Sequence, residues 1–434
     1  MREMKDSGIA WIGEIPNDWK VGRIKYYVSK VGSGKTPKGD NNLYTEGNVL
    51  FLRSQNIYDT GIALDFPPTV ITDAIDKEMS NTRVVKDDVL LNITGGSIGR
   101  CCIYNLNEKA NVNQHVSIIR AKKNKMFPEY MHYFWISNLG QNAIQLYQTG
   151  GNREGMSAIA IKNTPIPVIS LSEQKMIVDY LDSKCADIDS LAVDIQNQIE
   201  ILKEYKKSVI TQAVTKGIDP NVKMKDTVSP YWNQIPMNWY LSDIKYVFEI
   251  VKRIAGKEGY DILSVTQKGL KIKDISHNEG QIAENYKGYQ FVYPGDFVMN
   301  HMDLLTGWVD LSKLFGVTSP DYRVFKLRDN HVNEARYYKY VMQCCYSCRI
   351  FYSLGQGVST LGRWRLQTSA FNNFLIPVPP IKEQLKIADF LDTKCAEIDA
   401  AIAGKQKQLD VLKEYKKSLI YEYVTGKKEV PCRE

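Results

Sequence analysis

The sequence predicts an α+β protein, in which two mainly β domains are separated by two long antiparallel coiled-coil helices in a pseudo-twofold, cyclically permuted arrangement. Three observations predict it. Residues 166–215 recur 210 residues later, with 26 of the 50 aligned positions identical, which indicates an internal duplication. Each copy carries a heptad pattern of apolar residues, as in a helix that packs on another helix. The blocks between the copies alternate β-branched and aromatic residues with turns, as strands do.

A second repeat, at a different spacing, indicates the cyclic order. The residues Lys5, Asp6, Ile15, Pro16 and Trp19 recur 220 residues later as Lys225, Asp226, Ile235, Pro236 and Trp239. The first intervening block is therefore ten residues longer than the second. Residues 1–13 resemble the segment after the first repeated helix, whereas the chain stops just after the second. We therefore expect the start of the chain to complete the unit that its end begins.

A proline-containing segment precedes each repeated helix. We expect this segment to be extended, because proline disfavours a helix interior. We expect Ser172 to cap the first helix, with Glu173 in its first turn. A helix over residues 172–214 would be roughly 65 Å long, and Gly217 and Gly426 are expected to follow the two helix ends. Seven apolar heptad positions are assigned to the partner-binding helices: Leu181, Ile188, Ile195, Leu202, Leu391, Ile398 and Leu412. Lys405 interrupts the second stripe, and ordinary amphipathic core helices remain the alternative.

Composition favours a globular protein of two or more domains. The 434 residues exceed what one hydrophobic core usually supports. We see no run of about 18 apolar residues, no signal peptide and no lipidation motif, so a cytoplasmic location is expected. The eight cysteines show no regular spacing and are expected to be free thiols. The net charge of +7 permits a polyanionic partner without requiring one.

No catalytic, cofactor or metal site is identified in this chain. Residues 32–36 (GSGKT) resemble a nucleotide-binding loop, but Ser29 stands where that loop needs glycine and Pro37 follows instead of a helix. We interpret the segment as a basic turn. Residues 319–322 (SPDY) depart from the adenine-methyltransferase signature at two positions, and no glycine-rich strand–turn–helix accompanies them. The cysteines at 344, 345 and 348 lack a second ligand pair for zinc and are interpreted as core.

Polar, basic and glycine-rich loops occur in both intervening blocks. Arginine, asparagine and glutamine are the side chains that read base edges, and glycine lets backbone amides approach phosphates. Any one of these loops alone is more often a solvated turn than a DNA contact. Together they predict DNA binding by Lys35, Lys38, Arg53, Ser54, Gln55, Asn56, Ser97, Arg100, Asn113, Gln114, His115, Asn152, Arg153, Thr266, Gln267, Lys268, Asn300, His301, Arg323, Arg363 and Arg365.

The whole chain resembles the specificity subunit of type I restriction–modification enzymes. The features that carry the resemblance are Ile-Pro-x-x-Trp at residues 15–19 and 235–239, Gly-x-Gly-Lys-Thr-Pro at 32–37, the Glu-Gln helix starts after Leu171 and Ile381, and Leu-Lys-Glu-Tyr-Lys-Lys-Ser at 202–208 and 412–418. Two copies in this order are highly specific to that family.

The resemblance implies five segments: an N-terminal segment (1–13), target recognition domain 1 (14–165), a central region with a long helix (166–233), target recognition domain 2 (234–375) and a C-terminal region with a long helix (376–434). It implies a non-catalytic subunit that reads a bipartite site in double-stranded DNA. Two modification subunits would dock and bring S-adenosylmethionine and adenine-N6 methylation. Restriction subunits would add ATP- and magnesium-dependent cleavage.

Two other function classes remain open from the sequence. One is a single-chain DNA modification enzyme or nuclease with an unrecognised active site, which methyl transfer by the isolated chain would reveal. The other is a helical scaffold that binds only protein. Salt-dependent DNA binding by the assembled complex would argue against the scaffold, because phosphate contacts release counterions.

Overall fold

The computed structural model describes residues 2–37, 47–149, 155–274, 285–357 and 364–431. The chain divides into two compact units. Unit 1 comprises residues 1–195 and 407–434, and unit 2 comprises residues 196–406. The long helices α5 (Leu171–Lys216) and α10 (Ile381–Val424) each contribute residues to both units.

Unit 1 is built on antiparallel strands with short helices. Apart from its parts of α5 and α10, its helices and strands are β1 (Met4–Asp6), β2 (Glu14–Pro16), β3 (Lys20–Arg23), β4 (Val28–Ser33), β5 (Val49–Leu52), β6 (Ile57–Tyr58), β7 (Gly61–Ile62), β8 (Val70–Ile71), α1 (Asp73–Glu78), β9 (Arg83–Val84), β10 (Val89–Asn92), β11 (Cys101–Ile103), β12 (Ala110–Val112), β13 (Val116–Ala121), α2 (Pro128–Ile136), α3 (Asn138–Tyr147), α4 (Ala158–Asn163) and β14 (Pro165–Val168).

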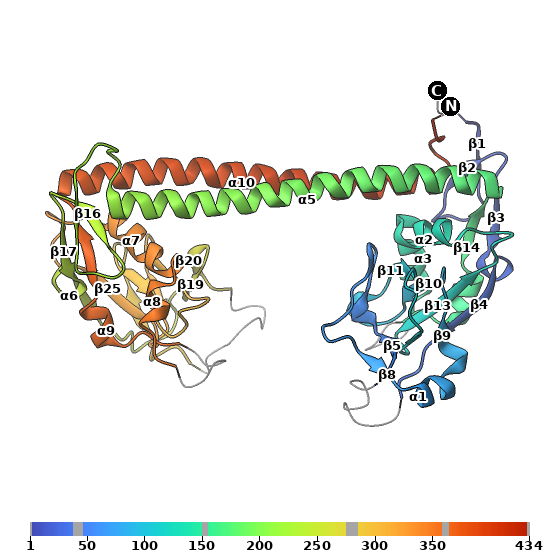
Figure 1. Ribbon diagram of the computed structural model, residues 1–434, viewed down its shortest axis with the longest axis horizontal. Helices are drawn as coiled ribbons and strands as arrows, with labels where there is room; N and C mark the ends of the chain where they lie inside the picture. Colours follow the sequence, from blue (N-terminus) through green and yellow to red (C-terminus); the bar gives the residue numbers. More distant parts are fainter. Residues whose placement is uncertain (1, 38–46, 150–154, 275–284, 358–363, 432–434) are drawn as a thin grey trace. The chain divides into compact units, whose positions relative to one another are not determined.

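The largest sheets of unit 1 are two four-stranded sheets, with strand orders β11-β10-β13-β4 and β8-β5-β12-β9. The first is antiparallel throughout, whereas β12 runs parallel to β5 in the second. Figure 1 shows α2 and α3 between the first sheet and the long helices. The Tyr133 hydroxyl on α2 donates to Asp182 on α5 at 2.6 Å, which ties α2 to α5.

Unit 2 repeats this plan with fewer strands. Apart from its parts of α5 and α10, its helices and strands are β15 (Met224–Asp226), β16 (Gln234–Pro236), β17 (Tyr240–Asp243), α6 (Ile244–Val247), β18 (Phe248–Val251), β19 (Leu263–Thr266), β20 (Gly269–Ile272), β21 (Gln290–Val292), β22 (Phe297–Met299), β23 (Val309–Leu311), β24 (Gly316–Thr318), β25 (Arg323–Leu327), α7 (Ala335–Ser347), α8 (Ile350–Ser353), α9 (Thr368–Asn372) and β26 (Leu375–Val378).

The main sheet of unit 2 has the order β18-β25-β22-β23 and matches the first sheet of unit 1 strand for strand. Strand β4 of unit 1 corresponds to β18 of unit 2, and each pairs with the last strand of its sheet, β13 or β25. That last strand also pairs with the first strand of a hairpin, which is β10–β11 in unit 1 and β22–β23 in unit 2. The Tyr340 hydroxyl on α7 donates to Asp392 on α10 at 2.7 Å, as Tyr133 does to Asp182. The two divergent blocks therefore share one core architecture.

Helix α5 starts slightly earlier than the sequence suggested. The expected cap was Ser172, but the Ser170 hydroxyl accepts the Glu173 amide at 3.1 Å, and Leu171 is the first helical residue. The cap therefore lies two residues earlier, because the Ser170 hydroxyl is the one that accepts an amide three residues on. Gly217 and Gly426, with φ of 76° and 70°, follow the two helix ends as predicted.

The two long helices contact each other in an antiparallel sense within each unit. In unit 1, Lys416 pairs with Asp189 at 2.7 Å, and in unit 2, Lys206 pairs with Asp399 at 2.7 Å. The two ion pairs occupy equivalent positions in the two copies. Adding 210 to Asp189 and Lys206 gives Asp399 and Lys416. The helix interface thus repeats with the sequence.

Matching hairpins also lie at the glycine ends of the helices. Strand β1 pairs with β2, and β15 pairs with β16 in the same register 220 residues later. A β-carbon on Gly426 would lie 2.5 Å from Pro16, and one on Gly217 would lie 3.9 Å from Pro236. Each helix therefore ends against a hairpin of the same kind, which for α10 is the N-terminal hairpin of unit 1.

The segment expected as a basic turn begins where strand β4 ends, and Lys35 beyond it is exposed. Strand β4 includes Ser33, and the Gly34 amide donates to the Val116 carbonyl at 3.2 Å. A β-carbon on Gly34 would lie only 1.8 Å from the Val112 carbonyl oxygen, so this position requires glycine. The glycine serves close packing of three strands and does not form a phosphate loop.

Within the described ranges, we find no helix that combines the length and apolar character needed to cross a membrane.

Candidate nucleic-acid interface

Four of the predicted DNA-binding residues lie outside the described residues, namely Lys38, Asn152, Arg153 and Arg363. The others lie in two groups, one in each unit.

The group in unit 1 gathers where four strands end or begin. The Asn92 amide group, at the end of β10, donates to the Ser54 carbonyl at 2.8 Å. The Ile93 amide donates to the His115 carbonyl at 3.0 Å, and the Asn113 amide donates to the Leu52 carbonyl at 3.0 Å. These bonds bring three separate predicted loops, around residues 54, 95 and 114, to one end of the sheets.

Three of the predicted residues in this group support the loops themselves. The Arg53 guanidinium pairs with Asp65 at 2.9 Å, and the buried Asn56 amide group donates to the Ala63 carbonyl at 2.8 Å. The Asn113 carboxamide, which is also buried, accepts the His115 amide at 3.1 Å. Each of the three already uses a polar atom inside the loops, namely the Arg53 Nη2, the Asn56 Nδ2 and the Asn113 Oδ1, so reading DNA with these atoms would require the bonds to break.

Other predicted residues of unit 1 present polar groups closer to solvent. Lys35, Gln55 and Gln114 are exposed, and Ser54, Ser97, Arg100 and His115 are half-buried. The Arg100 guanidinium lies over the Tyr58 ring at 4.8 Å, which orients it without neutralising its charge. The Gln55 amide group donates to Asp65 at 3.2 Å. Gln114 contacts Thr36, and its amide group lies 3.3 Å from the His115 ring.

The group in unit 2 occupies the same end of the matching sheet. Asn300 and His301 follow β22, and Arg323 begins β25. The Leu366 amide donates to the His301 carbonyl at 3.0 Å, which places the neighbouring Arg365 at this end. The corresponding bond in unit 1 runs from the Met156 amide to the Ile93 carbonyl at 2.9 Å.

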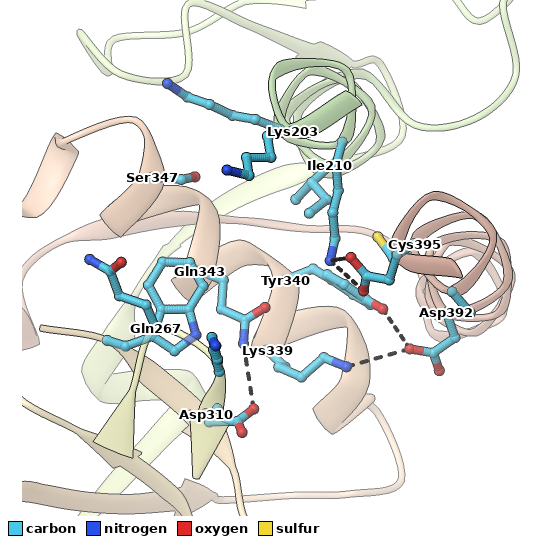
Figure 2. Close-up of a pocket in the computed structure, with 17 residues that line it drawn as sticks. Lys203, Ile210, Gln267, Asp310, Lys339, Tyr340, Gln343, Ser347, Asp392 and Cys395 are labelled. Carbon is cyan, nitrogen blue, oxygen red and sulfur yellow. Dashed lines mark hydrogen bonds and ion pairs between the residues drawn. The ribbon is translucent and has the colours of Figure 1, made fainter. Parts of the chain in front are cut away.

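The remaining predicted residues of unit 2, Thr266, Gln267 and Lys268, form the turn between β19 and β20. The Thr266 hydroxyl donates to the Gly269 carbonyl at 2.9 Å and accepts the Lys268 amide at 3.2 Å, which fixes the turn. Gln267 and Lys268 are exposed at its tip. They line a pocket of about 710 Å³ that is bounded by helices α5, α7 and α10 (Figure 2).

This pocket is rich in lysine, although several charges are paired. Lys206 pairs with Asp399, and Lys339 pairs with Asp392 (Figure 2). Lys207 and Lys268 line the same pocket and form no ion pair within the described part of the chain. The pocket can therefore accept an anion along its α5 side.

Comparisons with known proteins agree with this duplicated arrangement. The family model described as type I restriction modification DNA specificity domain matches residues 16–201 and 237–411. The chain belongs to this family. The two matches fall on the two blocks that the repeats delimit.

Relatives of this specificity subunit match either nearly all of it or about half of it. The type I restriction enzyme MjaVIII specificity subunit of Methanocaldococcus jannaschii is 24% identical over 430 residues, which cover 95% of this chain and 93% of the relative. The EcoKI specificity subunit of Escherichia coli is 22% identical over 211 residues, or 46% of this chain and 44% of the relative. A chain solved in a study of assembly and conformational transition of the type I restriction–modification system has the same fold, with a TM-score of 0.69, 14% identity and coverage of 95% and 99%.

The apolar stripe assigned to the partner-binding helices is largely buried inside the specificity subunit. Leu181, Ile188, Ile195, Leu391 and Ile398 are at most 9% exposed, and Leu202 and Leu412 are half-buried. Leu181 and Ile188 belong to the core of unit 1, and Leu391 belongs to that of unit 2. These side chains pack the chain's own helices and cores, so they are not available to a partner.

Sequence reasoning missed the role of the repeated Glu-Gln pair of the specificity subunit. The Gln384 carboxamide is fully buried, accepts the Glu334 amide at 2.8 Å and donates to the carbonyls of Val332 and Pro379 at 3.2 and 2.8 Å. Gln174 makes the equivalent bonds to Phe127, Lys125 and Ile169. The sequence did carry a signal for this role. A polar residue that is identical in both copies and lies next to an apolar stripe indicates a buried structural hydrogen bond.

Proposed function

We propose that this chain is the non-catalytic DNA-reading subunit of a type I restriction–modification complex, with one half of a bipartite site read by each unit. One observation carries the proposal. The two units share one sheet architecture, but each has different polar residues at the same end of its sheet. A shared scaffold with different residues at one end suits two readers of different half-sites. The family match supports the same proposal.

In unit 1, we propose that Lys35, Ser97, Arg100, Gln114 and His115 contact DNA, because their polar groups are near solvent. In unit 2, we propose the same of Gln267, Lys268, Asn300 and Arg365. Arginine and glutamine are suited to guanine and adenine edges, and lysine is suited to phosphates. Lys207, beside the turn that carries Lys268, is a further candidate for a phosphate contact.

We also propose that α5 and α10 form an antiparallel coiled coil, and that the chain is a cyclically permuted duplication with the five segments given above. The repeated ion pairs Lys206–Asp399 and Lys416–Asp189 support the first part. The packing of Gly426 against the N-terminal hairpin supports the second, since Gly217 packs against the equivalent hairpin.

The partners would be two modification subunits, which bind S-adenosylmethionine and methylate adenine, and restriction subunits that use ATP and magnesium. Duplication favours two copies of one partner, because each copy of the helix offers the same exposed apolar pair. These pairs are Ile201 with Tyr205, which are 67% and 49% exposed, and Val411 with Tyr415, which are 59% and 54% exposed. A complex of this kind would act in the cytoplasm.

The proposal is tested by electrophoretic binding of the complex of this chain with its modification partner to a library of duplexes that carry bipartite sites. We expect one pair of half-sites at one spacing to be preferred. Equal binding to all duplexes would contradict the proposal. A parallel reaction of the isolated chain with S-adenosylmethionine should transfer no methyl group, and transfer would favour a single-chain enzyme instead.

A further inference from the structure

A buried arginine in unit 2 lacks a counterion. Arg323 is 5% exposed, and its Nη2 donates to the Leu366 carbonyl at 3.1 Å and to the Thr368 hydroxyl at 3.3 Å. The guanidinium lies over the Phe371 ring at 4.4 Å. Its Nη1 has no hydrogen-bond partner, and no carboxylate of the described residues pairs with it. An unpaired buried charge is strongly unfavourable and calls for a partner from outside the chain.

The surroundings of Arg323 add positive charge instead of balancing it. Arg365 is exposed and forms no ion pair with any residue that the structure describes. His301 is 7% exposed, and its Nδ1 also lacks a partner. Burial, followed by the charges of Arg323 and Arg365, lowers the pKa of His301 to about 3. The carboxylate of the same loop, Asp303, accepts the amides of Leu305 and Thr306.

The fold itself does not require arginine at this position. In unit 2, Arg323 pairs across the sheet with Met299, the last residue of β22. In the matching sheet of unit 1, the equivalent pair is Ser117 with Leu91. Ser117 is fully buried, so a small neutral side chain satisfies the same architecture. The shared sheet architecture therefore does not explain the arginine.

We propose that Arg323, His301 and Arg365 form an anion site that binds one phosphodiester group of the DNA read by unit 2. The site rests on the proposed DNA-reading function. The Arg323 Nη1 and the Arg365 guanidinium would donate to the non-bridging phosphate oxygens. Neutral His301 would also donate, in the tautomer that carries its proton on Nδ1. A phosphate fits better than a base edge, because its full negative charge balances the unpaired guanidinium and a neutral guanine edge does not.

The site can be tested without DNA, by thermal unfolding of the full chain in inorganic phosphate and in chloride at equal ionic strength. Phosphate stabilises most proteins by exclusion, so the readout is the gain relative to variants. The wild-type gain should exceed that of Arg323→Met by about 2 °C. Arg365→Met, which changes an exposed side chain, should lose part of the gain. Equal gains in the wild type and both variants would overturn the site.

Arg253→Met is the matched control, because Arg253 is a paired arginine of the same unit, 2.5 Å from Asp296. It should lower the melting temperature in both salts yet keep the gain from phosphate. Arg323→Met should not melt below the wild type in chloride, since it removes an unpaired charge. A lower melting temperature would show that Arg323 stabilises the fold and would count against the site.

DNA binding by the assembled complex gives the second test. Arg323→Met should weaken binding about tenfold and lower the slope of log affinity against log salt by about 0.9, equally for every sequence. Relaxed preference at one base pair with an unchanged slope would instead assign Arg323 to base reading and overturn the phosphate site. If the wild-type complex shows no bipartite preference, the proposed function fails, whereas the phosphate-dependent melting still reports on the site alone.

Discussion

At the scale of residues, buried polar side chains hold each unit to the long helices. Gln174 and Gln384 satisfy backbone groups that neither a strand nor a helix pairs. Asp182 and Asp392 accept tyrosine hydroxyls from α2 and α7. These residues are identical in both copies because the same gaps in backbone bonding recur in both units.

Replacing Gln384 with leucine should destabilise unit 2 by about 3 kcal/mol, because it leaves buried backbone groups unpaired. Urea unfolding measures the loss. Hydrogen exchange of the Glu334 amide should also accelerate, since that amide donates to Gln384. Gln267→Leu, at an exposed turn position, is the control and should change neither quantity. An unaltered exchange rate at Glu334 would contradict the role of Gln384.

The Asp392 carboxylate predicts an acid-sensitive contribution to stability. Burial alone would raise its pKa, but the hydrogen bond from Tyr340 and the charges of Lys339 and Arg336 lower it below the ordinary value. The charged form is therefore favoured by folding, and its stabilisation is present above the unfolded pKa of about 4. It is lost as the pH falls through the lower, folded pKa.

Asp392→Asn should accordingly cost about 1 kcal/mol at pH 7, a small value because the site is partly solvated. The difference from the wild type should shrink as the pH drops below about 4. Chemical unfolding across this pH range measures it. Asp194→Asn, at an exposed position of α5, is the control. A difference that persists unchanged at acid pH would show that geometry matters more than charge.

At the scale of elements, each long helix has a buried face and an exposed face with different roles. The heptad stripe is used within the chain, since Leu181 and Leu391 are fully buried in the two cores. The pairs Ile201–Tyr205 and Val411–Tyr415 are exposed, and we propose them for contacts with partners. Periodicity identified the stripe but could not say whether its packing partner was this chain or another, because both bury the same side chains.

Tyr205→Glu and Tyr415→Glu should each remove one modification subunit from the complex, and the double variant should remove both. A buried tyrosine at an interface is worth about 2 kcal/mol or more, and a glutamate would also have to be desolvated. Light scattering of the purified complex gives the stoichiometry. Tyr26→Glu and Tyr246→Glu form the matched control, since they are exposed and also occupy equivalent positions. Two partners retained by the Tyr205, Tyr415 double variant would exclude this face.

At the scale of the whole molecule, the two blocks carry matching main sheets, and the proposed function predicts that they can be exchanged. Their main sheets have the same strand order, but the polar residues at the equivalent end of each sheet are different. Exchanging residues 14–165 for the corresponding block of another family member should change one half-site and leave the other half-site unaltered. Methylation-sensitive sequencing of DNA from cells with the hybrid and its partners measures both halves. A change in both would contradict independent reading.

The sequence by itself determined the duplication and the two long helices. A strong pattern, such as the heptads after residue 171, is a local periodicity that can be read from the sequence alone. The glycines at 217 and 426 marked the helix ends for the same reason, since positive φ is a local requirement.

Only the tertiary structure decided which polar residues are available to a ligand. Arg53, Asn56 and Arg323 were all predicted to bind DNA, but Arg53 and Asn56 bond within their own loop, whereas Arg323 is a buried charge with no counterion among the described residues. Composition cannot distinguish these cases, because pairing and burial depend on residues that are distant in sequence. The equivalence of Ser117 and Arg323 likewise required the registers of two sheets whose sequences have diverged.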